Sequence, residues 1–180
     1  MVQFKAFTAN AEVNGETVLS VVDGLGAFKK QASDILMKNG INNPQPGQWY
    51  SQQAWLNAFK EIAEKIGARS LNAIGKKIPQ NAKFPPGIDT IDKALASIDV
   101  AYHMNNRNGE IGYYKYEKTS AKSGRMICKN PFPCDFDRGI IEAMAQRFKP
   151  ADSVMVMVDH DKTKSCRKNG AESCEYIITW

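Results

Sequence analysis

The sequence predicts an α+β fold, in which amino-terminal helices pack on a four-stranded, mainly antiparallel sheet with one further helix between its strand pairs. Three observations support this class. Apolar residues recur at helical spacing between about residues 24 and 104, short β-prone segments dominate about residues 110–180, and a separate helical stripe divides those segments into two pairs. Because neither part can bury its apolar face alone, we expect a single domain over residues 1–180.

The first half is expected to contain three helices that share one core. The first covers residues 27–38. The second begins after Ser51, whose hydroxyl is available as a cap, and its apolar pattern could extend as far as residue 74. The third follows Pro85 and Pro86, since the missing N–H group of proline is not needed in the first turn of a helix.

Four strands are expected in the second half, with a fourth helix between the two pairs. The helix covers about residues 137–148, and Asp135 and Asp137 are placed to cap its amino terminus. The amino-terminal segment, residues 4–22, also has β-prone stretches, but the pattern assigns it to no element. The strands are expected at residues 112–117, 125–129, 153–159 and 174–180.

Composition and charge narrow the classes of function. Lysine and arginine number 24 against 19 acidic residues, which gives a net charge of +5. The basic residues are scattered rather than gathered in a block, so we expect a solvated basic surface and no nucleic-acid partner. No apolar run is long enough for membrane insertion and no secretory signal is visible, so the expected location is cytoplasmic. These patterns leave a homodimer open.

The cysteines are the most informative chemistry, because all of them lie in the last third of the chain. Antiparallel strands and the start of the fourth helix could bring their sulfurs to one edge of the sheet, within reach of one ion. Four thiolates suit zinc and, less well, an iron–sulfur cluster, whose usual spacings this sequence does not match. Two disulfides would need an oxidising compartment, and plain buried thiols are the remaining alternative. The four are Cys128, Cys134, Cys166 and Cys174.

Three short motifs in the carboxy-terminal half have counterparts in a known family. They are Cys134-Asp135-Phe136-Asp137-Arg138-Gly139-Ile140-Ile141, the pair Cys166 and Cys174, and the closing Cys174-Glu175-Tyr176-Ile177-Ile178-Thr179-Trp180. In these motifs the chain resembles the vinyl-reductase-type ligand-binding domains, a family that shares its fold with haem-based nitric-oxide sensors and with a Golgi transport subunit. The resemblance covers residues 110–180, and the helical half matches only loosely, around residues 47–50.

The resemblance implies a small-molecule-binding or sensor domain with a zinc site. In the aromatic-sensing members, a cysteine before the helix and a cysteine pair near the end bind zinc, with an acidic residue just before the pair. Thr163 stands where the acidic residue is expected, so Cys128 or Asp161 would have to complete the site. The chain is also similar to thiazoline-carboxylate hydrolase-like proteins. This similarity implies an alternative function, a hydrolase built on the same fold. Carried over by position, the zinc ligands are Cys134, Cys166 and Cys174.

Aromatic side chains indicate where a ligand pocket would lie. Rings on the second and third helices and on the first hairpin would line any cavity between the helices and the sheet, and such a cavity would bind a small apolar or aromatic ligand. Packing in a solid core is the alternative. The residues expected at this pocket are Trp55, Phe59, Tyr102, Tyr113 and Tyr114.

Each of the two histidines has two interpretations. His103 ends the third helix, where it could ligate haem, although a polar helix terminus is favoured. His160 could supplement a metal site, although a solvated turn is favoured. Whether the chain is an enzyme depends on the metal: four protein ligands close a zinc site, whereas three ligands and a water would allow hydrolysis.

Overall fold

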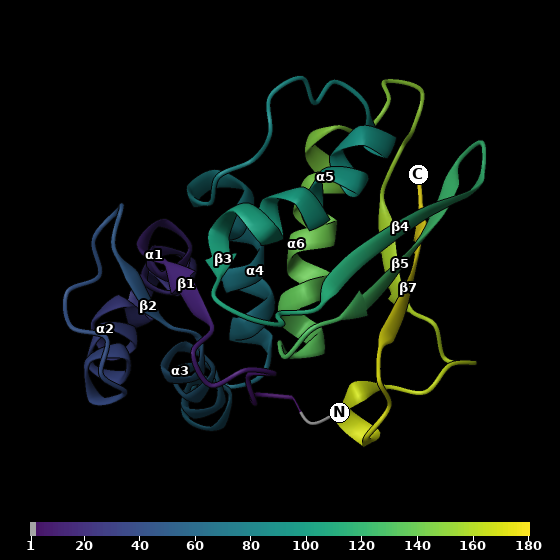
Figure 1. Ribbon diagram of the computed structural model, residues 1–180. Coiled ribbons are helices and arrows are strands. Elements are labelled where there is room, and N and C mark those ends of the chain that lie inside the picture. The colour runs from purple at the N-terminus through teal and green to yellow at the C-terminus, as the bar shows by residue number, and fades with distance from the viewer. Residues whose placement is uncertain (1–2) are drawn as a thin grey trace.

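The computed structural model describes residues 3–180 and has the expected α+β architecture (Figure 1). In this part of the chain the α-helices are α1 (Gly15–Gly24), α2 (Lys29–Lys38), α3 (Gln52–Lys65), α4 (Arg69–Asn81), α5 (Ile91–Asn105) and α6 (Cys134–Arg147). The strands are β1 (Glu12–Asn14), β2 (Trp49–Ser51), β3 (Asn106–Arg107), β4 (Tyr113–Ser120), β5 (Ser123–Lys129), β6 (Met157–His160) and β7 (Cys174–Thr179). Two short 3-10 helices are η1 (Gly26–Phe28) and η2 (Arg167–Asn169). None of these helices is long and apolar enough to cross a membrane.

The larger sheet is antiparallel throughout and has the strand order β4-β5-β7-β6. Alternate residues of β5 and β7 are buried, so one face of the sheet packs on helices. Helices α5 and α6 contact the sheet, and α4 packs against α6 on the side away from it (Figure 1). In the sheet register Cys128 of β5 lies opposite Cys174 of β7.

A second, three-stranded sheet lies in the helical half and has the order β2-β1-β3. The sequence did not predict it, because strands of two or three residues are too short to show an alternating pattern. Strand β1 leads directly into α1, and the Asn14 side chain caps that helix by accepting a hydrogen bond from the Thr17 backbone N–H at 3.0 Å. The unassigned segment 4–22 therefore contains β1 and most of α1.

The first two expected helices are present with altered limits. The helix expected at residues 27–38 begins as the 3-10 turn η1 and continues as α2. Ser51 caps α3 as expected, by accepting a hydrogen bond from the Ala54 backbone N–H. The extension to residue 74 is wrong, because Gly67 adopts a φ of 116° and the separate helix α4 follows it.

The two prolines do not begin the next helix. Pro85 and Pro86 lie in an irregular segment with a bend at Pro86, and the next residue, Gly87, has a φ of 81°, a left-handed conformation that favours glycine. Helix α5 begins only at Ile91, and the Thr90 hydroxyl caps it. The two prolines therefore mark a bend before the helix and not its first turn.

Helix α6 begins earlier than expected, at Cys134, and Pro133 rather than an aspartate occupies its cap position. Asp137 is buried and forms a salt bridge with Arg167, so the capping role expected for it is wrong. The strand expected at residues 153–159 is shorter and forms β6. Met157 pairs with Thr179, the last residue of β7, so the residues before Met157 have no part of β7 to pair with.

Glycines allow α4 and α6 to approach closely. A Cβ added at Gly75 would lie 2.2 Å from the Phe136 backbone oxygen, and one added at Gly139 would lie 2.2 Å from the Asn72 backbone oxygen. Neither position has space for a side chain. This crossing fixes the amino-terminal half of α6 against the helical part of the molecule.

Candidate metal centre and adjoining cavity

Four side chains from separate segments converge beside the amino terminus of α6. Cys134 is the first residue of α6 and His160 is the last residue of β6. Cys166 immediately precedes η2, and Cys174 is the first residue of β7. One ligand atom from each residue lies within 4.8 Å of the others. The prediction that the three cysteines of this group meet is confirmed.

The loop between Cys166 and Cys174 is folded so that its two ends approach each other. Gly170 ends η2 in the left-handed conformation, with a φ of 89°, and the Ala171 backbone N–H donates to the Cys166 backbone oxygen at 3.2 Å. The sulfurs of Cys166 and Cys174 lie 3.6 Å apart, and each lies 3.3 Å from the sulfur of Cys134. Sulfurs around a tetrahedral zinc ion are about 3.8 Å apart, so this spacing suits such an ion.

His160 supplies the nitrogen ligand of the group. Its Nδ1 lies 3.3 Å from the backbone oxygen of Asp161, and a donated N–H there leaves the lone pair on Nε2. Nε2 is buried and has no hydrogen-bond partner among residues 3–180. Tyr176 packs against the ring nearly edge to face, with centroids 5.2 Å apart. A buried imidazole nitrogen without a partner fits a metal ligand, so the solvated turn that the sequence favoured does not describe this residue.

Nitrogen donors lie around the three sulfurs, and the thiolate form that binds metals is favoured at Cys174, whereas the shared hydrogen bond raises the pKa of Cys134. The pKa of Cys174 is lowered to about 4, chiefly by a hydrogen bond from the Cys134 thiol and then by the charge and hydrogen bond of Arg167. The donors are Gln3 Nε2 to Cys134 at 2.9 Å, the Lys168 backbone N–H to Cys166 at 3.4 Å, and the Arg167 backbone N–H and Nε to Cys174 at 3.3 Å each.

Two residues that the sequence offered as the fourth ligand lie outside the group. Cys128 is fully buried in β5, and its sulfur is not among the clustered ligand atoms. Asp161 uses Oδ1 to accept hydrogen bonds from the backbone N–H and the hydroxyl of Thr163, at 2.9 and 2.7 Å. The turn after β6 thus presents His160 to the cysteines, which residue spacing alone could not show.

A buried ion pair adjoins the cluster. The side chains of Arg167 and Asp137 are 1% and 0% exposed and contact each other directly. Arg167 also donates to the backbone and side-chain oxygens of Asn130. Asp137 Oδ1 accepts hydrogen bonds from the Tyr114 hydroxyl at 2.6 Å and from Asn130 Nδ2 at 3.2 Å. Burial raises the pKa of Asp137 to about 6, while the direct contact with the Arg167 guanidinium favours the carboxylate form.

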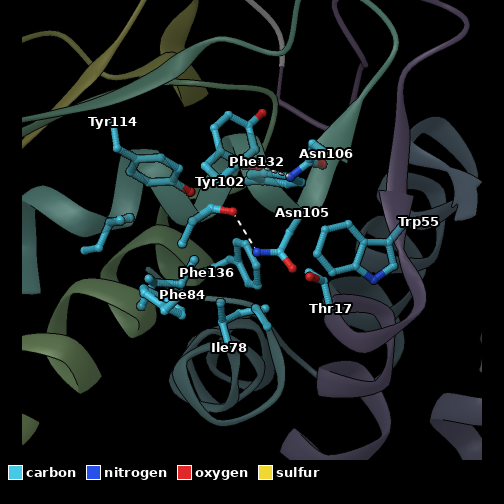
Figure 2. Close-up of a pocket in the computed structure, with 14 residues that line it drawn as sticks. Thr17, Trp55, Ile78, Phe84, Tyr102, Asn105, Asn106, Tyr114, Phe132 and Phe136 are labelled. Carbon is cyan, nitrogen blue, oxygen red and sulfur yellow. Dashed lines mark hydrogen bonds between the residues drawn. The ribbon is translucent and has the colours of Figure 1, made fainter. Parts of the chain in front are cut away.

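A small, apolar cavity of about 30 Å³ lies between the helices and the sheet. Figure 2 shows Tyr114 and Trp55 on opposite sides of it, with the rings of Tyr102, Phe132 and Phe136 between them. The Trp55 ring lies 5.4 Å from that of Phe132 and 5.7 Å from that of Phe136. The other lining residues are Thr17, Ile78, Ala82, Phe84, Ile98, Ala101, Asn105, Asn106 and Ile140.

Three of the five aromatic residues expected at a pocket line this cavity: Trp55, Tyr102 and Tyr114. Phe59 packs against Trp55, with ring centroids 4.6 Å apart, and belongs to the core beside the cavity. Tyr113 is 40% exposed and does not line the cavity, because consecutive residues of a strand point to opposite faces of the sheet.

The cavity wall contains polar groups of two kinds. The Asn105 amide is fully engaged and donates to the Ala101 backbone oxygen at 2.7 Å, as Figure 2 shows. Thr17 Oγ1 and Trp55 Nε1 are buried and have no hydrogen-bond partner within the described part of the chain. Figure 2 shows the Trp55 nitrogen on the edge of the indole that faces away from the other lining rings, so of these two atoms Thr17 Oγ1 is the one placed to bind a polar group of an occupant.

Comparison with solved structures identifies the fold. An H-NOX protein from S. oneidensis, in the Fe(II) ligation state, matches with a TM-score of 0.67 at 14% identity, over 92% of this chain and 95% of that chain. H-NOX proteins from K. algicida and T. tengcongensis match with TM-scores of 0.63 and 0.64 at 16% and 14% identity, over 92% of this chain and 95% and 96% of theirs. The fold is the H-NOX fold. No family model and no curated protein matches the sequence.

The H-NOX fold supports one part of the family resemblance. That resemblance implied a fold shared with haem-based nitric-oxide sensors, and the H-NOX neighbours agree with it. The same neighbours lend no support to the narrower likeness to vinyl reductases or to the Golgi subunit. At this level of identity the comparison shows the fold alone.

H-NOX proteins are described with a heme, but the residues of this chain do not fit one. The chain has two histidines, of which His160 belongs to the cluster. The His103 side chain is 51% exposed, and its Nδ1 lies 2.9 Å from the Asp99 backbone oxygen at the end of α5. The hydroxyls of Tyr102 and Tyr114 already donate hydrogen bonds. A cavity of about 30 Å³ among packed rings also has no space for a macrocycle.

Proposed function

We propose that this chain is a small-molecule-binding domain of H-NOX fold in which Cys134, His160, Cys166 and Cys174 hold a structural zinc ion. The observation that carries the proposal is the convergence of four ligand atoms within 4.8 Å, one of them a buried imidazole nitrogen without a partner among residues 3–180. A bound ion would fasten the loop of residues 161–173 to α6 and to the sheet.

The donor set favours zinc over the alternatives. Three sulfurs and one imidazole nitrogen form a common tetrahedral zinc site. An iron–sulfur cluster of the ferredoxin type needs four thiolates, and Cys128 is not in the group. No disulfide joins any of the four cysteines in the structure. Four protein ligands leave no open position for substrate or water, so we assign a structural ion and set the hydrolase alternative aside.

The cavity supports the ligand-binding half of the proposal. An apolar wall with a polar atom, here Thr17 Oγ1, is the usual character of a small-molecule site. The volume of about 30 Å³ is well below the roughly 150 Å³ of a cavity that binds benzene. The proposed ligand is therefore very small, or is a ring that enters by displacing an aromatic side chain of the wall.

Metal analysis tests the zinc assignment. Protein purified without chelator is expected to contain zinc in equimolar amount. Cys166→Ser is expected to lose it, whereas Cys128→Ser, which alters a buried thiol outside the group, is expected to retain it. Unaltered protein free of zinc, or equal zinc loss in the two variants, would contradict the assignment.

A thermal-shift screen of the zinc-loaded protein tests the ligand assignment. Suitable probes are toluene, benzyl alcohol and indole, because a compound that binds only the folded state raises Tm as its concentration exceeds Kd. Thr17→Val keeps the shape of the wall and removes its hydroxyl, so it should weaken the binding of benzyl alcohol more than the binding of toluene. A panel without any shift would contradict the ligand-binding half and leave the zinc assignment standing.

A further inference from the structure

Arg167 is a buried cation placed between the metal cluster and the core. Among residues 3–180 it is the only lysine or arginine that is buried, with 1% exposure. Its Nε donates to Cys174 Sγ at 3.3 Å, and its other guanidinium nitrogens bind Asn130 and Asp137. Burying a cation is costly unless anions and acceptors surround it, and an apolar side chain would fill the same space. The retained charge therefore indicates a role beyond packing.

The same hydrogen bonds lead from the cluster to the cavity. Asp137 binds Arg167 through Oδ2, and its Oδ1 accepts the hydrogen bond of the Tyr114 hydroxyl at 2.6 Å. Tyr114 lines the cavity on the side opposite Trp55 (Figure 2). A continuous series of buried contacts thus joins Cys174, Arg167, Asp137 and Tyr114.

The charges in this series let a change at the cluster or at Tyr114 alter how Arg167 is shared between Cys174 and Asp137. A zinc ion held by three thiolates carries a net charge of about −1. Asp137, in its salt bridge with Arg167, is a second negative centre, and Arg167 lies between the two. By donating to Asp137, the Tyr114 hydroxyl takes up part of the carboxylate charge. If that hydroxyl turned to another acceptor, Asp137 would attract Arg167 more strongly, at the expense of Cys174.

We propose that Arg167 is a positioning residue that couples the metal cluster to the cavity. A cavity ligand that accepts a hydrogen bond from Tyr114 lowers the affinity for the metal. Because linkage is reciprocal, the bound metal lowers the affinity for that ligand by the same factor. This inference rests on the proposed function, since it requires a bound metal and a cavity ligand. It adds the chemical class of the ligand, a hydrogen-bond acceptor, and its effect on the metal.

Two matched tyrosine variants test the coupling without any ligand. Tyr114→Phe and Tyr102→Phe each remove one hydroxyl from the cavity wall, but that of Tyr102 donates to the Ile111 backbone oxygen at 2.5 Å and not to Asp137. Zinc affinity is measured in the full chain by competition with a chromophoric chelator. Tyr114→Phe is expected to weaken zinc binding about threefold to tenfold, less than the 10- to 100-fold typical of a direct partner of a metal ligand. Tyr102→Phe is expected to change it less than about twofold.

A cobalt spectrum and a double variant separate this coupling from a general loss of structure. Replacement of zinc by cobalt gives sulfur-to-metal absorption bands, which Tyr114→Phe is expected to shift and Tyr102→Phe to leave unchanged. Arg167→Met is expected to weaken zinc binding about 10- to 100-fold, and Arg167→Lys to restore part of the affinity. In the Arg167→Met background, Tyr114→Phe should have no further effect, because the link is already broken.

The outcomes distinguish the two proposals. Unchanged zinc affinity and an unchanged cobalt spectrum in Tyr114→Phe would overturn the coupling and leave the proposed function intact. Additive effects of Tyr114→Phe and Arg167→Met would overturn Arg167 as the link. Unaltered protein that binds neither zinc nor cobalt would overturn the metal site and the coupling together.

Discussion

The cluster of Cys134, His160, Cys166 and Cys174 and the aromatic cavity adjoin each other but are built in opposite ways. The cluster gathers three sulfurs and an imidazole nitrogen within 4.8 Å, and nitrogen donors hold the sulfurs. The cavity gathers aromatic rings around about 30 Å³ of apolar space. A polar site identifies its occupant through the chemistry of its donor atoms. An apolar site limits the size and shape of its occupant and says little else.

Removal of the metal should have the largest effect on stability, and it changes the cluster and not the cavity. Zinc at about 1,000 times its Kd is expected to raise the free energy of unfolding by about 4 kcal/mol, which corresponds to a Tm increase of roughly 8–16 °C. Calorimetry with zinc and with chelator measures this difference. Cys166→Ser should abolish the increase in Tm that zinc produces, and Cys128→Ser should keep that increase. A Tm that does not depend on zinc would show that the core alone holds the last loop.

Trp55→Ala acts on the cavity side. Loss of this buried indole, which packs on Phe59, Phe132 and Phe136, is expected to lower the free energy of unfolding by about 3–5 kcal/mol in urea titrations. Because the space created is apolar, added indole should recover part of the loss. Zinc affinity should stay unchanged, since Trp55 lies across the cavity from Tyr114. A weakened zinc site in this variant would break the separation between the two regions.

Gly139→Ala strains the helix that serves both regions. Helix α6 carries Cys134 at its start and places Ile140 in the cavity wall. The new Cβ would meet the Asn72 backbone oxygen, so we expect a loss of about 1–3 kcal/mol in denaturant unfolding together with weaker zinc binding. Gln146→Ala, at an exposed position of the same helix, should stay within about 0.5 kcal/mol. Equal stability of the two variants would mean that the helix crossing relaxes freely.

Glu61 lies in neither region and gives the smallest expected effect. Its carboxylate pairs with Lys65 at 2.6 Å and with Lys38 at 2.9 Å, and these contacts lower its pKa to about 2. Because the folded pKa lies below the ordinary value of 4.5, this stabilisation is present above about pH 4.5 and is lost as the pH falls toward 2. Glu61→Gln should therefore cost at most about 1 kcal/mol at pH 7 and less in acid. Urea unfolding at both pH values measures this, and a change in zinc affinity would be inconsistent with its remote position.

The sequence predicted the cluster in part. Cys134, Cys166 and Cys174 could be identified from their spacing and from the family resemblance. His160 could not be assigned, because its direction depends on how the turn at Asp161 folds. Arg167 carried no signal, since a single arginine next to a cysteine is ordinary on a protein surface.

The helical half shows a different limit. Long amphipathic segments such as α3 were found because their pattern extends over several turns. Strands of two or three residues have no measurable period, so the small sheet was missed. The cavity wall was found only where its rings lie on patterned elements. Phe132 and Phe136 come from the turn into α6 and from its first residues, where no periodic signal exists.

Strand β7 lies between β5 and β6 although it follows both in the chain. During translation, β6 therefore emerges before its one sheet partner among the described residues has been made. Until then Val158, which the completed sheet buries, is exposed beside unpaired backbone, next to Met155 and Met157, which stay exposed in the folded chain. Since β7 begins with Cys174, the strand that joins β5 to β6 and the last member of the Cys/His cluster are synthesised together. The interval just before residue 174 leaves the ribosome is when this chain would be most exposed to aggregation and most in need of a chaperone.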